Sequence, residues 1–61
     1  MRYVDYVYDI IKEDCVDMDA IYKDHIIRLV GYSGFDALCE ERLLESCGVV
    51  HDRTLYVLCD K

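Results

Sequence analysis

The sequence GVVHDRTLYVL, residues 48–58, sets the architecture at the C-terminal end of this 61-residue chain. Val49 and Val50 begin a run of strand-forming residues, and residues 54–58 continue it with threonine, tyrosine, valine and leucine. His-Asp-Arg at 51–53 separates the two runs and predicts a short turn, although the Asn-Gly or Asp-Gly pair typical of tight hairpins is absent. The stretch therefore predicts a C-terminal β-hairpin.

Three helices are predicted ahead of this hairpin, over residues 4–15, 20–30 and 33–47. Apolar residues recur at helical spacing in each of them. Gly31 is expected to end the second helix, because glycine accepts the left-handed conformation that follows many helices. Gly48 is expected to end the third for the same reason.

The apolar positions indicate which helix faces enter the core. Glu40 and Glu41 interrupt the third stripe, which is compatible with a bend there. The apolar positions are Val4, Val7, Tyr8, Ile11 and Cys15; Ala20, Ile21, Tyr22, Ile26, Ile27, Leu29 and Val30; and Phe35, Leu38, Cys39, Leu43, Leu44 and Cys47.

The predicted fold is a single α+β domain over residues 1–61, with three helices followed by a C-terminal β-hairpin.

Composition limits the class of protein. The chain has 13 acidic and 7 basic side chains, a net charge of −6 and 54% apolar residues. This apolar content excludes intrinsic disorder, and the length excludes a second domain. No stretch reaches the roughly 20 apolar residues of a membrane span. Because residues 1–11 include Asp5 and Asp9 and lack the continuous apolar run of a signal peptide, a cytoplasmic location is expected.

The four cysteines, Cys15, Cys39, Cys47 and Cys59, have two interpretations. In a cytoplasmic protein they are reduced thiols that pack as small hydrophobic residues, whereas in a secreted protein an even number would indicate two disulfides. The absence of an export signal favours reduced thiols.

Neither a metal site nor a catalytic thiol is assigned from these residues. Cys47, His51 and Cys59 would supply three zinc ligands only if the hairpin folded back on the third helix, and their spacing is wider than in familiar zinc sites. Glu13 and Asp14 are expected to raise the pKa of Cys15, which disfavours a reactive thiolate. We therefore predict no enzyme, no metal and no cofactor.

The C-terminal half resembles a winged helix-turn-helix domain. The residues that carry the resemblance are 44–50, LESCGVV, and 54–58, TLYVL. In that family a third helix ends in leucine, a few polar residues, glycine and two aliphatics, and a hairpin wing follows. The resemblance implies a similar body and a third helix that reads the DNA major groove.

The residues expected to read DNA do not match that family. Its third helix usually presents polar and basic side chains, and affinity for DNA depends on neutralising phosphates with Lys and Arg. Here Arg42 is the only cation on this stretch. Its other charged positions are acidic, and they are Asp36, Glu40, Glu41 and Glu45.

Six tyrosines are the most informative surface feature. Tyr3 and Tyr6 lie beside Ile10, off the main apolar stripe of the first predicted helix. Tyrosine is enriched at protein interfaces, because it combines a large contact area with a hydrogen-bonding hydroxyl. The other interpretation is that the tyrosines complete the core of a small protein.

Two functions follow from these observations. The favoured one is a non-catalytic protein-interaction module that uses Tyr3, Tyr6 and Ile10 to bind another protein or a second copy. Small acidic single-domain chains of this kind are common among accessory proteins of phages and mobile elements. The alternative is a winged-helix transcriptional regulator that contacts DNA through Arg42, His51 and Arg53.

Overall fold

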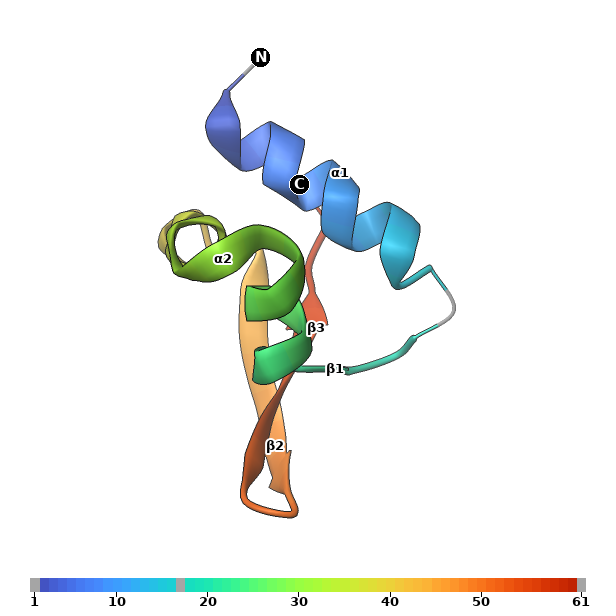
Figure 1. Cartoon of the computed structure of the whole chain (residues 1–61). Helices are drawn as coiled ribbons and strands as arrows, with labels where there is room; N and C mark the ends of the chain where they lie inside the picture. Colours follow the sequence, from blue (N-terminus) through green and yellow to red (C-terminus); the bar gives the residue numbers. More distant parts are fainter. Residues whose placement is uncertain (1, 17, 61) are drawn as a thin grey trace.

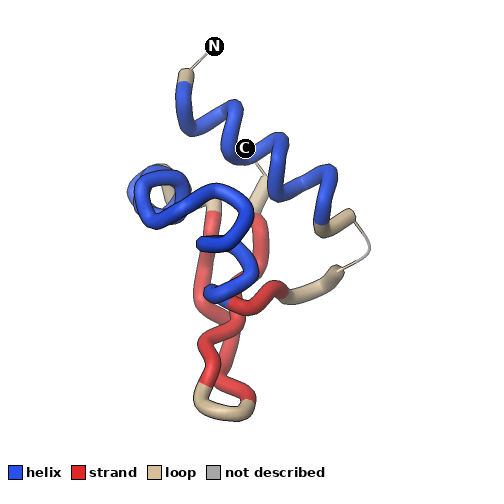
Figure 2. Tube along the Cα trace, viewed as in Figure 1, coloured by secondary structure: helices blue, strands red, loops and turns tan. Residues whose placement is uncertain are grey.

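The computed structural model describes residues 2–16 and 18–60. Within these residues lie two helices and a three-stranded antiparallel sheet with strand order β1-β3-β2 (Figure 1). The hairpin of β2 and β3 extends beyond the helices at its turn end (Figure 2). In chain order the elements are α1 Tyr3–Asp14, β1 Ile21–Tyr22, α2 Lys23–Glu40, β2 Leu44–Val50 and β3 Arg53–Leu58.

The α+β class is confirmed, but the prediction of three helices followed by a hairpin is wrong. The second and third predicted helices form one element, α2, which is kinked at Gly31 (φ 75°, ψ 174°). This backbone conformation is essentially restricted to glycine. The predicted break therefore exists as a kink, and residues 44–47, predicted as helix, belong to β2.

The predicted third helix extends too far, to residue 47, whereas α2 ends at Glu40. The prediction missed this end because it is a Schellman motif that contains no glycine. Arg42 adopts the left-handed conformation (φ 58°) and donates its N–H to the carbonyl of Cys39 over 3.0 Å. Leu43 donates its N–H to the carbonyl of Leu38 over 2.9 Å. These are the paired bonds that close such a motif, and both leucines are buried. Gly48, the predicted end of the helix, lies within β2.

The predicted hairpin is present, and its first strand starts five residues earlier than Val49, at Leu44. The turn consists of His51 and Asp52, both with positive φ (52° and 63°), as in a type I′ turn. Arg53, predicted in the turn, begins β3 and pairs with Val50.

The sheet includes a strand that the sequence did not predict. Ile21 and Tyr22, expected in the second helix, form β1 and pair with Tyr56 and Leu55 of β3. A two-residue strand is too short to show the alternation by which strands are recognised. This pairing positions the start of α2 next to the sheet.

The core lies where α1, α2 and the sheet meet. The predicted buried stripe of α1 is confirmed in full, and Phe35 and Tyr56 pack edge to face with ring centroids 5.2 Å apart. Cys47, predicted in the core, is exposed because its strand extends away from the helices. The buried apolar residues are Val4, Val7, Tyr8, Ile11, Cys15, Ile21, Ile26, Phe35, Leu38, Leu43 and Leu44.

Two further features complete the description. All four cysteines are free thiols. In the part of the chain that the structure describes, neither helix combines the length and the apolar character needed to span a bilayer.

Candidate functional site

The structure places the three residues predicted to bind a partner along one side of α1. Tyr3 and Tyr6 are three residues apart and Tyr6 and Ile10 are four apart, so they form one stripe on the helix. The exposed fractions of Tyr3 and Tyr6 are 51% and 56%, and Ile10 is partly buried. We call this stripe, Tyr3, Tyr6 and Ile10, the tyrosine face.

The six tyrosines divide between core and surface. Tyr8 is buried, and Tyr22 and Tyr56 are partly buried. Tyr3, Tyr6 and Tyr32 are exposed, the last by 70%. The interpretation that tyrosines complete the core is confirmed for Tyr8. For the exposed tyrosines, the role in an interface stays a prediction.

The tyrosine face is held against α2 and bordered by acidic side chains. The hydroxyl of Tyr3 lies 3.1 Å from the Oγ of Ser33, within hydrogen-bond distance. Asp9 and Glu13 are exposed, and they follow Tyr6 and Ile10, respectively, by three residues, so both border the tyrosine face. Arg2, at the start of α1, forms an ion pair with Glu41 beyond the end of α2.

The three residues expected to contact DNA are not brought together. Arg42 precedes β2 and His51 follows it, so the whole length of β2, about 20 Å from end to end at roughly 3.3 Å per step, lies between them. Arg53 lies at the hairpin end, where its Nε is 4.0 Å from the Oδ2 of Asp24 and its guanidinium is 5.6 Å from the Tyr22 ring centre. These residues form no continuous basic surface.

Cys47, His51 and Cys59 do not converge either. Cys59 follows Leu58, which pairs with Leu44, whereas Cys47 lies in the irregular step of β2 opposite Leu55 and Tyr56. His51 is in the turn at the opposite end of the hairpin. The hairpin is extended, so the condition for a zinc site at these residues is not met.

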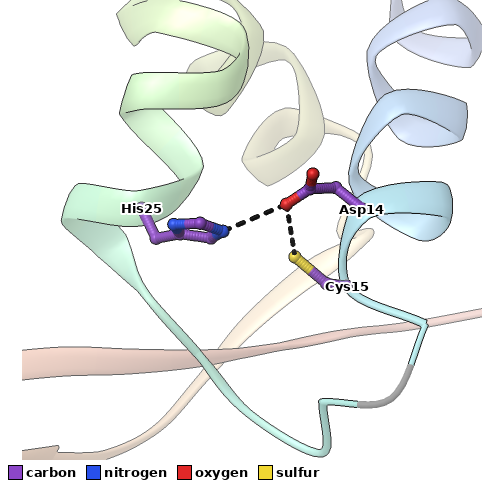
Figure 3. A group of neighbouring side chains, drawn as sticks. All are labelled: Asp14, Cys15 and His25. Carbon is purple, nitrogen blue, oxygen red and sulfur yellow. Dashed lines mark hydrogen bonds and ion pairs between the residues drawn. The ribbon is translucent and has the colours of Figure 1, made fainter.

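A different group of ligand-type side chains does converge, at the C-terminal end of α1 (Figure 3). The Nε2 of His25 lies 3.2 Å from the Oδ2 of Asp14, and the Sγ of Cys15 lies 3.9 Å from the same oxygen. The side chains of His25 and Cys15 both point toward the Asp14 carboxylate (Figure 3). One carboxylate therefore orients a thiol and an imidazole.

Local structure explains why these three residues meet. Cys15 caps α1 by donating its N–H to the carbonyl of Ile11 over 2.9 Å. The chain then returns to the sheet, where β1 pairs with β3 and α2 begins at Lys23. This brings His25, in the first turn of α2, back to the end of α1. The sequence does not identify His25 as part of a site, because no spacing in the sequence marks this return.

The surroundings of Cys15 and Cys39 disfavour reactive thiolates at these two residues. Burial is the main cause that raises the pKa of Cys15, and Asp14 raises it further. The predicted direction is thus confirmed, although burial contributes more than the adjacent acid. Burial followed by Asp36 raises the pKa of Cys39, against a smaller opposing effect of Lys23.

Comparison with known proteins adds no relative. No family model, curated protein or solved structure matches this chain. Membership of the winged-helix family stays a prediction, but the third helix that the resemblance implies over residues 44–47 is wrong, because these residues lie in β2.

Proposed function

We propose that this protein is a non-catalytic, cytoplasmic interaction module that binds another protein through the tyrosine face. The observation that carries the proposal is the exposure of Tyr3 and Tyr6 by 51% and 56% on a helix whose opposite side is buried. Aromatic side chains that stay exposed beside a packed core are characteristic of protein interfaces, where tyrosine is enriched.

Charge favours one kind of partner. The chain carries a net charge of −6, and Asp9 and Glu13 border the tyrosine face. A second copy would bring the same negative charge to the interface, whereas a partner with basic residues around an apolar centre would complement both the tyrosines and the acids. The proposed partner is therefore a protein with a basic rim and an apolar centre.

Pre-organisation also supports binding at this face. The Tyr3 hydroxyl lies within hydrogen-bond distance of Ser33, and α1 is anchored by four buried residues. Side chains on a rigid helix lose less conformational entropy on binding than side chains on a loop. Tyr3 and Tyr6 are thus suited to act as anchors.

The test compares matched variants of the purified chain as bait in the cytoplasm of its own source. Wild type and a control, Val49→Ala/Val50→Ala on the hairpin, should retain the same protein, because both valines are exposed far from α1. Tyr3→Ala/Tyr6→Ala should lose that protein while keeping the wild-type circular dichroism. Retention should weaken as salt rises, because the acidic rim contributes.

Three results would count against the proposal. Capture that is unaffected by the tyrosine double variant would place the interface elsewhere. Concentration-dependent dimers in sedimentation that disappear in the same variant would identify a second copy as the occupant. Salt-sensitive retention of the purified chain on duplex DNA would favour the winged-helix regulator.

A further inference from the structure

We propose that Asp14, Cys15 and His25 form a binding site for a single transition-metal ion of the Zn²⁺ type. The donor atoms are one carboxylate oxygen, one sulfur and one imidazole nitrogen, and all three lie within 4.8 Å of one another. Among the residues that the structure describes, this is the only such group of three. Sulfur and imidazole ligands select borderline metals such as Zn²⁺ over Mg²⁺ or Ca²⁺.

Two of the three donor separations are close to those of a tetrahedral site. Metal–ligand lengths of about 2.0–2.3 Å imply separations of roughly 3.3–3.7 Å between neighbouring donor atoms. The nitrogen–oxygen separation is 3.2 Å and the sulfur–oxygen separation is 3.9 Å. The third separation, between sulfur and nitrogen, is within 4.8 Å, so the thiol and the imidazole have to move closer together to hold an ion with Asp14.

The surroundings suit a cation. Asp14 and Cys15 lie at the C-terminal end of α1, where the unpaired carbonyl groups of a helix carry partial negative charge. Cys15 is only 7% exposed, which restricts water on the sulfur side. When the ion binds, the sulfur–metal bond replaces the sulfur–hydrogen bond, and the thiol proton passes to solvent.

His25, one of the three proposed ligands, lines a cavity. A cavity of about 400 Å³ lies beside His25 and is lined in part by Met18, Tyr22 and Arg28. A site with three protein ligands and one open position leaves room for water or a small ligand on the metal. Because His25 lines the cavity, solvent reaches the imidazole side of the site.

The site can be tested with Co²⁺, which has visible and near-ultraviolet absorption where Zn²⁺ has none. The full chain, reduced and freed of metal with a chelator, is titrated with Co²⁺. We expect saturation at one ion per chain with a thiolate-to-metal charge-transfer band, displacement by Zn²⁺, and no displacement by excess Mg²⁺.

Matched variants locate the site. His25→Ala removes a partly exposed ligand and should weaken Co²⁺ binding at least about tenfold, since loss of even a supporting contact has that effect. His51→Ala, in the hairpin turn, is the control and should bind as wild type. Cys15→Ser should abolish the charge-transfer band, and circular dichroism shows whether this buried substitution preserves the fold.

The proposal is overturned by any of three results. These are absence of saturable Co²⁺ binding, equal binding by wild type and His25→Ala, or displacement of Co²⁺ by Mg²⁺. The last would show that surface carboxylates alone hold the ion. The His25→Ala result decides the matter even if Cys15→Ser fails to fold.

Discussion

The hydroxyl of Tyr8 donates a hydrogen bond to the backbone carbonyl of Cys59 over 3.0 Å, and so joins two residues that are 51 positions apart. Tyr8 lies in the middle of α1 and is buried, whereas Cys59 directly follows β3. The bond thus connects the first helix to the end of the last strand. Cys59 also donates its N–H to the carbonyl of Leu43 over 2.8 Å, which extends the sheet by one further bond.

Tyr8→Phe should lower the free energy of unfolding by about 1 kcal/mol, because it removes this bond and leaves the ring in place. The urea concentration at the midpoint of denaturation should fall, and the slope of the unfolding free energy against urea concentration should stay unchanged. Tyr3→Phe is the matched control: its hydroxyl contact with Ser33 is exposed, so we expect a change within about 0.5 kcal/mol. Equal effects of the two variants would contradict a structural role for the Tyr8 bond.

Gly34→Ala should destabilise the protein by about 1–3 kcal/mol, the usual effect of overpacking. A Cβ at this position would lie 2.7 Å from the Cβ of Val30 and 3.3 Å from a methyl carbon of Val7. The first of these atoms is fixed to the backbone, so α2 has to shift. Gly48→Ala is the control, because a Cβ added at Gly48 has no neighbouring atom within 4 Å. A thermal melt of Gly34→Ala at or above that of wild type would show that the helices adjust freely.

Leu38→Ala should leave the chain largely unfolded at ambient temperature. Leu38 is fully buried, and removing a buried leucine side chain costs about 2–5 kcal/mol. The core of so small a domain rarely supplies more than about 3–5 kcal/mol. Circular dichroism should show loss of cooperative melting, whereas Val49→Ala, 68% exposed on the hairpin, should melt as a folded protein. A folded Leu38→Ala protein would mean that other contacts dominate stability.

Alkylation should modify Cys47 before Cys15 and Cys39. Cys47 is exposed, whereas burial and nearby carboxylates raise the pKa of the other two thiols. A raised pKa leaves less thiolate at neutral pH, so these two should react faster only as pH rises past the ordinary thiol range. Brief iodoacetamide treatment followed by peptide mass analysis measures the order. Labelling of Cys15 as fast as Cys47 at neutral pH would contradict the buried position of Cys15.

Local patterns predicted the elements whose signals lie within a few residues. The 3.6-residue stripe of α1 places Val4, Val7 and Ile11 in the core, and the β-forming run at 54–58 becomes β3. The sequence correctly predicts a break in helical geometry at Gly31, although α2 is kinked there and continues to Glu40. The stripe also separated Tyr3 and Tyr6 from the core side of α1, and the structure confirms their exposure.

The remaining features depend on contacts between distant segments, so periodicity and composition do not encode them. α2 ends at Glu40 because Leu43 folds back to bond with Leu38, and no glycine marks that end. β1 exists only because β3 pairs with it, and this pairing returns His25 to Asp14 and Cys15. Side-chain spacing along a helix or strand is local and readable in the sequence, whereas the meeting of these three ligands results from the path of the chain through the packed domain.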